Sequence, residues 1–138
     1  MSTLIARLMK GVVAVVGCLA LSACGGPLGM LAGGALDGAT APFTDAVVPG
    51  EAGVIQLETR PDDPYSVNIG FTLIDGHMYM DPAAERSWYQ NIKANPDIRV
   101  RFDGTEMVYT ARAYPVSEAS ILAQFEADRI VLRIGPRS

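Results

Sequence analysis

Few side chains in this sequence could do chemistry, and the most informative pair lies in one short stretch. The only tryptophan, Trp88, is followed three residues later by Asn91 within MDPAAERSWYQNIKANPDIRVRFDG, residues 80–104. An indole can form the wall of a cleft for a flat ligand, and an amide can hydrogen-bond to that ligand. The same two residues could instead anchor a helix on a sheet and satisfy a nearby backbone group. The sequence leaves both interpretations open.

Composition argues against hydrolytic nucleophile catalysis and against a metal site. The chain has one histidine, His77, and two cysteines, Cys18 and Cys24. Neither cysteine is expected to remain a free thiol, because both fall in or at the end of an N-terminal leader. A Ser/His/Asp or Cys/His set therefore cannot be assembled, and a lone histidine needs several carboxylate partners to bind a metal. We expect no catalytic residue of these classes.

The strands that would surround the Trp88 segment follow from alternating apolar and polar residues and from turn signals. This alternation predicts strands over 53–59, 66–74 and 97–102, each with one buried face. In the second of these strands the buried face would carry Val67, Ile69, Phe71 and Leu73. Asp-Gly pairs at 75–76 and 103–104 favour hairpin turns. The remaining predicted strands cover residues 77–80, 106–116 and 129–134.

Two helices complete the expected order. Asp81 as an N-cap and Pro82 at the first helical position predict a helix that ends near Ala94, before Asn95-Pro96. Ser117 predicts the start of a second helix, with an apolar face made of Ile121, Leu122 and Phe125. The order β-β-β-α-β-β-α-β predicts a mainly β fold, a six-stranded antiparallel barrel with two helices packed outside. An open α+β sheet is the alternative.

Residues 75–116 resemble the FMN/F420-binding split β-barrel family, which has a fold like that of pyridoxamine phosphate oxidase. The similarity is greatest to its branch of deazaflavin-dependent nitroreductases and quinone reductases. Three groups of residues carry the resemblance: the helix and its end, a glycine turn, and a motif in the following strand. They are Trp88, Tyr89, Asn91, Ile92, Ala94, Asn95 and Pro96, then Gly104, then Ala111, Arg112, Ala113 and Val116.

The resemblance implies a split barrel with a cleft for FMN or F420, an oxidoreductase activity on a small flat ligand, and a homodimer. Trp88 and Asn91 would lie at that cleft. The loop after the first strand, with Thr59 and Arg60, would hold the phosphates of the cofactor. Here this loop reads TRPDDPYS, residues 59–66, with two aspartates where the family has glycines and a second basic residue. A cofactor-free binding or assembly module of the cell envelope is therefore the alternative function.

The N-terminus indicates export and lipid attachment. Residues 11–23 are uncharged and follow Arg7 and Lys10, which is typical of a secretory signal and too short for a stable transmembrane helix. The end, LSAC, resembles the lipobox of bacterial lipoproteins, and this implies acylation of Cys24. A plain secretory signal that happens to contain a cysteine is the alternative. We expect a signal peptide over 1–23, the lipidated cysteine and a flexible tether over 24–46, and the barrel domain over 47–138.

These features place the protein in the cell envelope, held to a membrane by its lipid. Gly25, in place of an acidic residue after the cysteine, favours the outer membrane in a diderm bacterium. Removal of residues 1–23 takes away Arg7 and Lys10 and leaves 9 basic against 15 acidic residues, a net charge of −6. This charge argues against a nucleic-acid partner and against electrostatic docking on anionic lipid.

Overall fold

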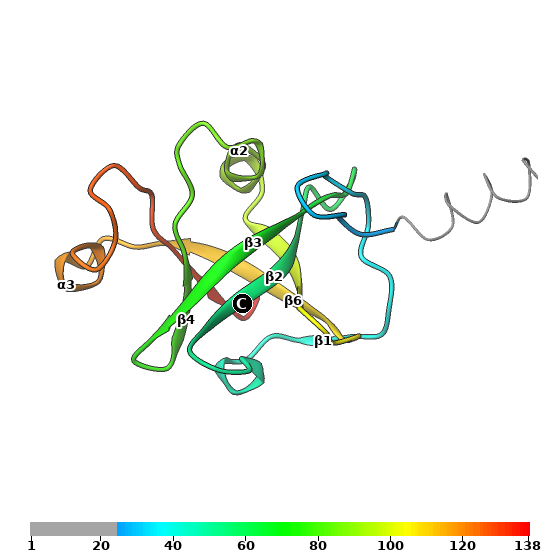
Figure 1. Cartoon of the computed structure of the whole chain (residues 1–138), viewed down its shortest axis with the longest axis horizontal. Helices are drawn as coiled ribbons and strands as arrows, with labels where there is room; N and C mark the ends of the chain where they lie inside the picture. The colour runs from blue at the N-terminus through cyan, green and yellow to red at the C-terminus, as the bar shows by residue number, and fades with distance from the viewer. Residues whose placement is uncertain (1–24) are drawn as a thin grey trace, which may run out of the picture.

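Six antiparallel strands close into a barrel in the computed structural model, which describes residues 25–138 (Figure 1). The strands follow the order β6-β5-β2-β3-β4-β7, and β7 pairs back with β6. This pairing closes the sheet, so the mainly β barrel is confirmed and the open-sheet alternative is wrong. The strands are β2 (Ala52–Thr59), β3 (Tyr65–Ile74), β4 (His77–Met80), β5 (Asp97–Phe102), β6 (Val108–Pro115) and β7 (Leu132–Gly135).

The alternating sequence of β5 accounts for the way the barrel buries its core. Its three apolar side chains are buried, whereas the arginines between them are only half-buried. The register sets Ile55 of β2 beside Phe102, and Leu57 beside Val100, so apolar residues of neighbouring strands share the inner face. The edge-to-face contact of Phe71 with Phe102, at 5.5 Å between ring centroids, extends this core into β3.

The β3–β4 hairpin has the predicted turn. Asp75 and Gly76 both have positive φ, 49° and 80°, as a two-residue hairpin loop with the twist of its strands requires. At the second predicted turn only Gly104 has positive φ, 77°. Both strands that lead into these turns end where the alternation predicted, at Ile74 and Phe102.

The first helix begins later than predicted. Helix α2 (Ser87–Ala94) starts six residues after Asp81, and its N-cap, Arg86, makes no side-chain capping bond. The carbonyls of Asp81 and Pro82 accept hydrogen bonds from Arg129 Nη1 (3.2 Å) and from the amide N–H of Ile130 (3.1 Å). Because these two carbonyls are bonded to the chain before β7 and not to a following helical turn, the prediction of an N-cap at Asp81 is wrong. The predicted end at Ala94 is confirmed.

The second helix is shorter than predicted. Helix α3 (Ala119–Leu122) is a single turn, in which Ile121 is buried and Leu122 is exposed. Phe125 lies outside this helix but still packs on the same small cluster, beside Tyr79. The described residues also include one short 3-10 helix, η1 (Asp45–Val47).

Residues 25–42 lie on the barrel, although their composition favours a flexible tether. Leu36 and Phe43 are buried at 2% and 0% exposure, and β1 (Thr40–Pro42) pairs in parallel with β6. A Cβ on Gly33 would come within 2.3 Å of the backbone of Gly26. The glycines that suggest flexibility therefore let two backbone segments pack closely here. The leader and Cys24 lie outside the described residues.

The same segment explains why one predicted polar position is buried. Ser66, on the face of β3 expected to be outward, is fully buried, and its hydroxyl donates to the carbonyl of Gly34 at 2.7 Å. On the predicted inner face only Phe71 is buried, and Val67, Ile69 and Leu73 are half-buried. No helix within residues 25–138 has the length and apolar character needed to cross a membrane.

Candidate functional site

A groove of about 900 Å³ lies between β3, the chain before α2 and the first turn of that helix. Half-buried and buried residues of β3, among them Val67, Ile69 and Phe71, form part of its lining. Met80 and Trp88 belong to the lining although they are almost fully buried, and Gly29 and Met30 of the N-terminal segment also line the groove. The charged side chains of the lining are Asp81, Glu85, Arg86 and Arg129.

Trp88 belongs both to the core and to this groove. Its side chain is 8% exposed and packs in the main hydrophobic cluster, together with Ile92 one turn later on α2. It also contributes to the groove lining. The interpretation as a core anchor is confirmed, and only the small part of Trp88 that stays exposed could contact a ligand in the groove.

Thr59 and Asn91 are brought together, but away from the groove lining. Asn91 Nδ2 donates to Thr59 Oγ1 at 3.0 Å, and the hydroxyl of Thr59 donates to the carbonyl of Tyr65 at 3.3 Å. Thr59 is buried at 1% exposure. These bonds join α2 to the ends of β2 and β3. The geometry thus shows a structural use for both side chains.

Arg60 is engaged with its own loop. It has a positive φ of 58°, and its Nε donates to the carbonyl of Asp63 at 3.0 Å. The guanidinium also lies 3.5 Å from the carboxylate of Asp63 and 5.3 Å from the centroid of the Tyr65 ring. The guanidinium of Arg60 therefore has its partners within its own loop and in Tyr65. Arg60 is absent from the groove lining.

Two basic residues in the groove lining were missed by sequence reasoning. Arg129 donates to the carbonyl of Asp81 and lies 3.5 Å from Glu126. Arg86 is exposed and makes no ion pair within residues 25–138. The signal that could have identified Arg86 is its place just before the helix. Arg86 was not singled out from the sequence, because the predicted helix began after Asp81 and so included Arg86 in its interior.

The start of α2 adds backbone donors to the same place. The first amide N–H groups of a helix have no partner within the helix, and no side chain caps this one. Arg86, Ser87 and Trp88 all line the groove. The uncapped helix start, Arg86 and Trp88 therefore line one groove, which also has the acidic Asp81 and Glu85 in its lining. A basic residue, free amides and an aromatic residue suit a ligand with an anionic group and a flat apolar part.

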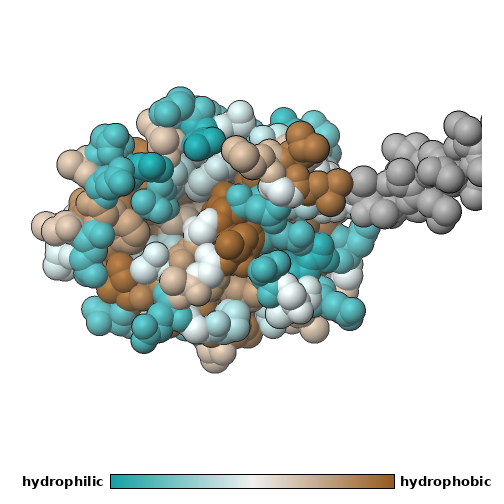
Figure 2. All heavy atoms as spheres, viewed as in Figure 1, coloured by the Kyte–Doolittle hydropathy of each residue, from teal (hydrophilic) through white to brown (hydrophobic). Residues whose placement is uncertain are grey.

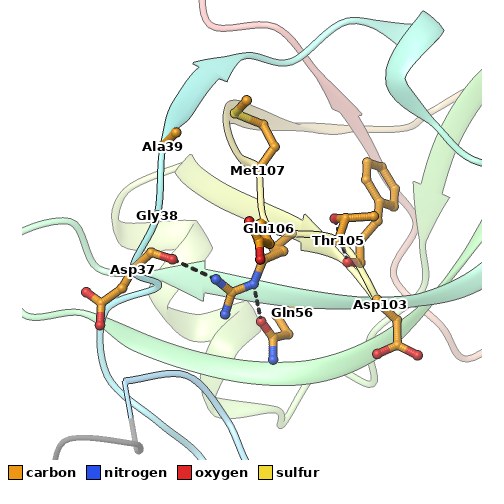
Figure 3. Close-up of a pocket in the computed structure, with 11 residues that line it drawn as sticks. Asp37, Gly38, Ala39, Gln56, Asp103, Thr105, Glu106 and Met107 are labelled. Carbon is orange, nitrogen blue, oxygen red and sulfur yellow. Dashed lines mark hydrogen bonds between the residues drawn. The ribbon is translucent and has the colours of Figure 1, made fainter.

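A second cavity, of about 610 Å³, lies between the N-terminal segment and the β5–β6 turn (Figure 3). The guanidinium of Arg101 is used there by structural partners, since it donates to the carbonyl of Asp37 and to Gln56 Oε1, both at 2.7 Å. The other charged residues of its lining are the acidic Asp37, Asp103 and Glu106. This cavity offers less to an anionic ligand than the groove. Across residues 25–138, no group of three or more His, Cys, Asp or Glu residues could hold a metal ion.

Tyr79 is the phenol with a perturbed acidity. Burial raises its pKa above the ordinary value of 10.0, and the negative charge of Glu118 acts in the same direction. Its ring lies 6.3 Å from that of Phe125 in the small cluster below α3. Tyr79 is therefore a protonated structural residue at neutral pH, and it does not line the groove.

Comparison with known proteins supports the barrel assignment. A family model described as F420H(2)-dependent quinone reductase matches residues 80–130, well under half of the chain. A comparison with curated proteins finds no significant match.

Two examples represent the solved structures that are similar to this chain. One is a protein from Listeria innocua named as a pyridoxamine 5'-phosphate oxidase, at 18% identity and a TM-score of 0.53, covering 62% of this chain and 84% of that one. The other is a FAD-binding protein from Mesorhizobium loti, at 18% identity and a TM-score of 0.47, covering 64% and 81%. At 18% identity, the similarity to the first of these structures shows a shared fold and nothing more. The family-model match and this fold support the resemblance to split-barrel proteins that bind flavin or F420.

Proposed function

We propose that this protein binds a flat, anionic redox cofactor of the flavin or deazaflavin class in the Trp88 groove and acts as a small oxidoreductase. One observation carries the proposal. Trp88, Arg86 and the uncapped start of α2 lie together on one groove. These residues also fall within the segment, residues 80–130, that matches the quinone reductase family model.

The residues of the groove fit such a group in two respects. The apolar lining from Val67, Ile69 and Trp88 suits one face of a ring system, because aliphatic and aromatic side chains pack well on flat surfaces. Arg86 and the free amides of the helix start suit a phosphate or carboxylate. When bound, such a ring supplies the hydride or electron chemistry, whereas the protein supplies binding, orientation and electrostatics.

The anion is assigned to Arg86 and not to the Thr59–Arg60 loop. The guanidinium of Arg60 is engaged with Asp63, and Asp62 adds a further negative charge in the same loop. Like charges about 4 Å apart cost about 1 kcal/mol each even in water. Asp81 and Glu85 also line the Arg86 groove. Arg86 is the better candidate for the anion because its guanidinium makes no ion pair within residues 25–138 and stays available.

The test is a titration of the full chain with FMN, FAD and F420. Binding is monitored by the quenching of the fluorescence of Trp88, the single tryptophan. Arg86→Ala is expected to weaken binding by about ten- to a hundredfold, the loss for one charge-assisted hydrogen bond. Arg60→Ala is the comparison variant, since Arg60 is absent from the groove lining although it lies over the ring of Tyr65, which belongs to that lining. Binding should change less than threefold.

The outcomes separate the two functions considered for this fold. Saturable binding that depends on Arg86 supports the proposal, and a reduction of a quinone or nitro compound by the bound cofactor would extend it. No binding of any of the three cofactors at about 50 μM, or binding that depends on Arg60 alone, contradicts it. Failure of all three would favour the cofactor-free envelope module.

We also propose that Cys24 is acylated and holds the barrel to a membrane of the cell envelope. The lipobox-like LSAC sequence and the uncharged stretch before it support this. Mass spectrometry of the N-terminal peptide from bacterial membranes should show a diacylglyceryl group on Cys24. Cys24→Ser should release the protein from the membrane fraction, and recovery of unmodified wild-type Cys24 would contradict the proposal.

A further inference from the structure

An exposed apolar tip stands out on the N-terminal segment. The large hydrophobic side chains Leu28, Met30 and Leu31 are 56%, 101% and 71% exposed, within four consecutive positions. Among the described residues, the other exposed large hydrophobic side chains are Val54 and Leu122, which are far from the tip in the sequence and from each other. Figure 2 shows hydrophobic atoms gathered at the end of the molecule where Figure 1 draws this segment in blue. Contiguous exposed apolar side chains of this kind are typical of interaction sites.

The tip is a hairpin. Leu28 and Leu31 exchange backbone hydrogen bonds of 3.1 and 2.8 Å, and Gly29 between them has a positive φ of 55°. A Cβ added to Gly29 would have no atom within 4 Å, so this position projects into open space. The exposure of the tip therefore follows from a defined turn.

The barrel holds this hairpin in place. Gly33 and Ser66 exchange two backbone bonds of 2.9 Å, and Asn68 Nδ2 donates to the carbonyl of Gly29 at 2.9 Å. At the base of the hairpin the amide of Gly34 donates to the carbonyl of Gly25 at 3.0 Å. The apolar tip, the barrel and the residue that follows Cys24 are thus fixed relative to one another.

The chemistry of the hairpin suits a lipid surface. Residues 25–36 contain no charged side chain, so the hairpin could enter an interface without burying a charge. Met30 in the two-residue turn, with Leu28 and Leu31 on either side of that turn, can reach the boundary between headgroups and acyl chains. The excess of acidic residues in the chain favours a zwitterionic surface over an anionic one.

We propose that the hairpin at residues 28–31 inserts into the interface of a zwitterionic phospholipid bilayer and orients the barrel on it. The proposal rests on the proposed lipidation of Cys24, which would bring the surface next to Gly25. Gly29 and Met30 also line the Trp88 groove. Insertion would therefore place the mouth of that groove beside the membrane, where it is accessible to a lipid-soluble reactant.

The experiment uses the full chain purified from bacterial membranes and reconstituted in phosphatidylcholine vesicles. A polarity-sensitive fluorophore is attached to the Met30→Cys variant, whose side chain is fully exposed in the parent, so folding is undisturbed. Leu122→Cys is the matched control, because Leu122 is also an exposed hydrophobic residue but lies on α3, at the other end of the molecule in Figure 1. Vesicles with brominated acyl chains report whether each label is in contact with lipid.

The expected result is a blue shift and bromolipid quenching for the label at position 30, with no change for the label at position 122. A label at position 30 that remains in water, although Cys24 is acylated, overturns the proposal. A blue shift that grows with protein concentration in detergent, without vesicles, also overturns it and indicates self-association of the hairpin.

The state of Cys24 is read by mass spectrometry in the same preparation, so failure of the anchor and failure of the hairpin are distinguishable. If Cys24 is unmodified, the probe variants are combined with Cys18→Ser and Cys24→Ser, and vesicles are added directly. A lipid-contacting label at position 30 then supports the hairpin without the anchor, and its absence overturns the proposal.

Discussion

Replacing Glu58 with glutamine should loosen the N-terminal segment from the barrel. Glu58 is buried at 5% exposure and receives three hydrogen bonds. Two come from Arg99 at 3.0 Å, one to each carboxylate oxygen, and one comes from the amide of Leu36 at 2.8 Å. Arg99 also donates to the carbonyl of Leu36. The carboxylate of Glu58 and the guanidinium of Arg99 thus both hold the N-terminal segment at Leu36.

The size of the effect follows from the number and environment of these bonds. Each hydrogen bond to a charged group contributes about 1.5–3 kcal/mol, and removal of one partner of a buried ion pair costs about 3–5 kcal/mol. Glutamine keeps one acceptor oxygen but turns an NH₂ group toward another donor. Because Arg99 retains 25% exposure and can be partly hydrated, we expect a loss at the lower end, about 3 kcal/mol.

Two measurements check this prediction. Urea unfolding gives the free energy, and a loss of about 3 kcal/mol should lower the melting temperature by roughly 10 °C for a domain of this size. Hydrogen exchange should show faster exchange at the amides of residues 25–42 than in β2–β3. Glu51→Gln is the control, since Glu51 is exposed and makes no ion pair within residues 25–138.

A loss below about 1 kcal/mol with unchanged exchange at Leu36 would refute the reasoning. It would mean that the ion pair adds little beyond the burial of Leu36 and Phe43. Faster exchange throughout the barrel, with no preference for residues 25–42, would also count against the reasoning. The Glu58–Arg99 ion pair would then stabilise the whole barrel and not the N-terminal segment in particular.

Two further predictions concern side chains outside the groove lining. Asn91→Ala removes the bond to Thr59 and should lower stability by about 1 kcal/mol in urea, with cofactor binding changed less than twofold; a much larger loss of binding would mean that the amide contacts the ligand. Tyr79 has a raised pKa, so its contribution to stability is complete below pH 10 and is lost as pH rises above 10 toward the folded pKa. Tyr79→Phe should therefore lose less stability than the parent between about pH 8 and 11 in urea unfolding, and equal losses would contradict the assigned burial effect.

Local chemistry was enough to predict most strands of the barrel. Alternation placed Ile98, Val100 and Phe102 on the inner face of β5, and a strand cannot present them differently without moving every neighbour to the opposite face. The Asp75-Gly76 turn was predictable for the same kind of reason, because it depends on the φ preferences of two adjacent residues. These features depend on neighbours in the sequence.

The start of α2 and the place of the N-terminal segment could not be predicted in this way. Asp81 and Pro82 are good helix-starting residues, but their carbonyls bond to residues 129 and 130, nearly fifty positions later. The glycine-rich residues 25–34 favour a tether by composition, but they form hydrogen bonds with Ser66 and Asn68 of β3. In both cases long-range hydrogen bonds override a local preference of about 1 kcal/mol.

The sequence by itself determined most of the strands, where the hairpins turn, and that Trp88 lies on a helix, because these depend on periodicity and on adjacent residues. The closure of the strands into a barrel depended on the tertiary structure, in which β7 pairs with both β4 and β6. Only the tertiary structure decided which residues share the groove. It joined Asn91 to Thr59 and Arg60 to Asp63, and it brought Arg86, Arg129 and Met30 to one opening. The physical reason is that a site is assembled by closure of the barrel, and closure brings together side chains that are distant in the chain.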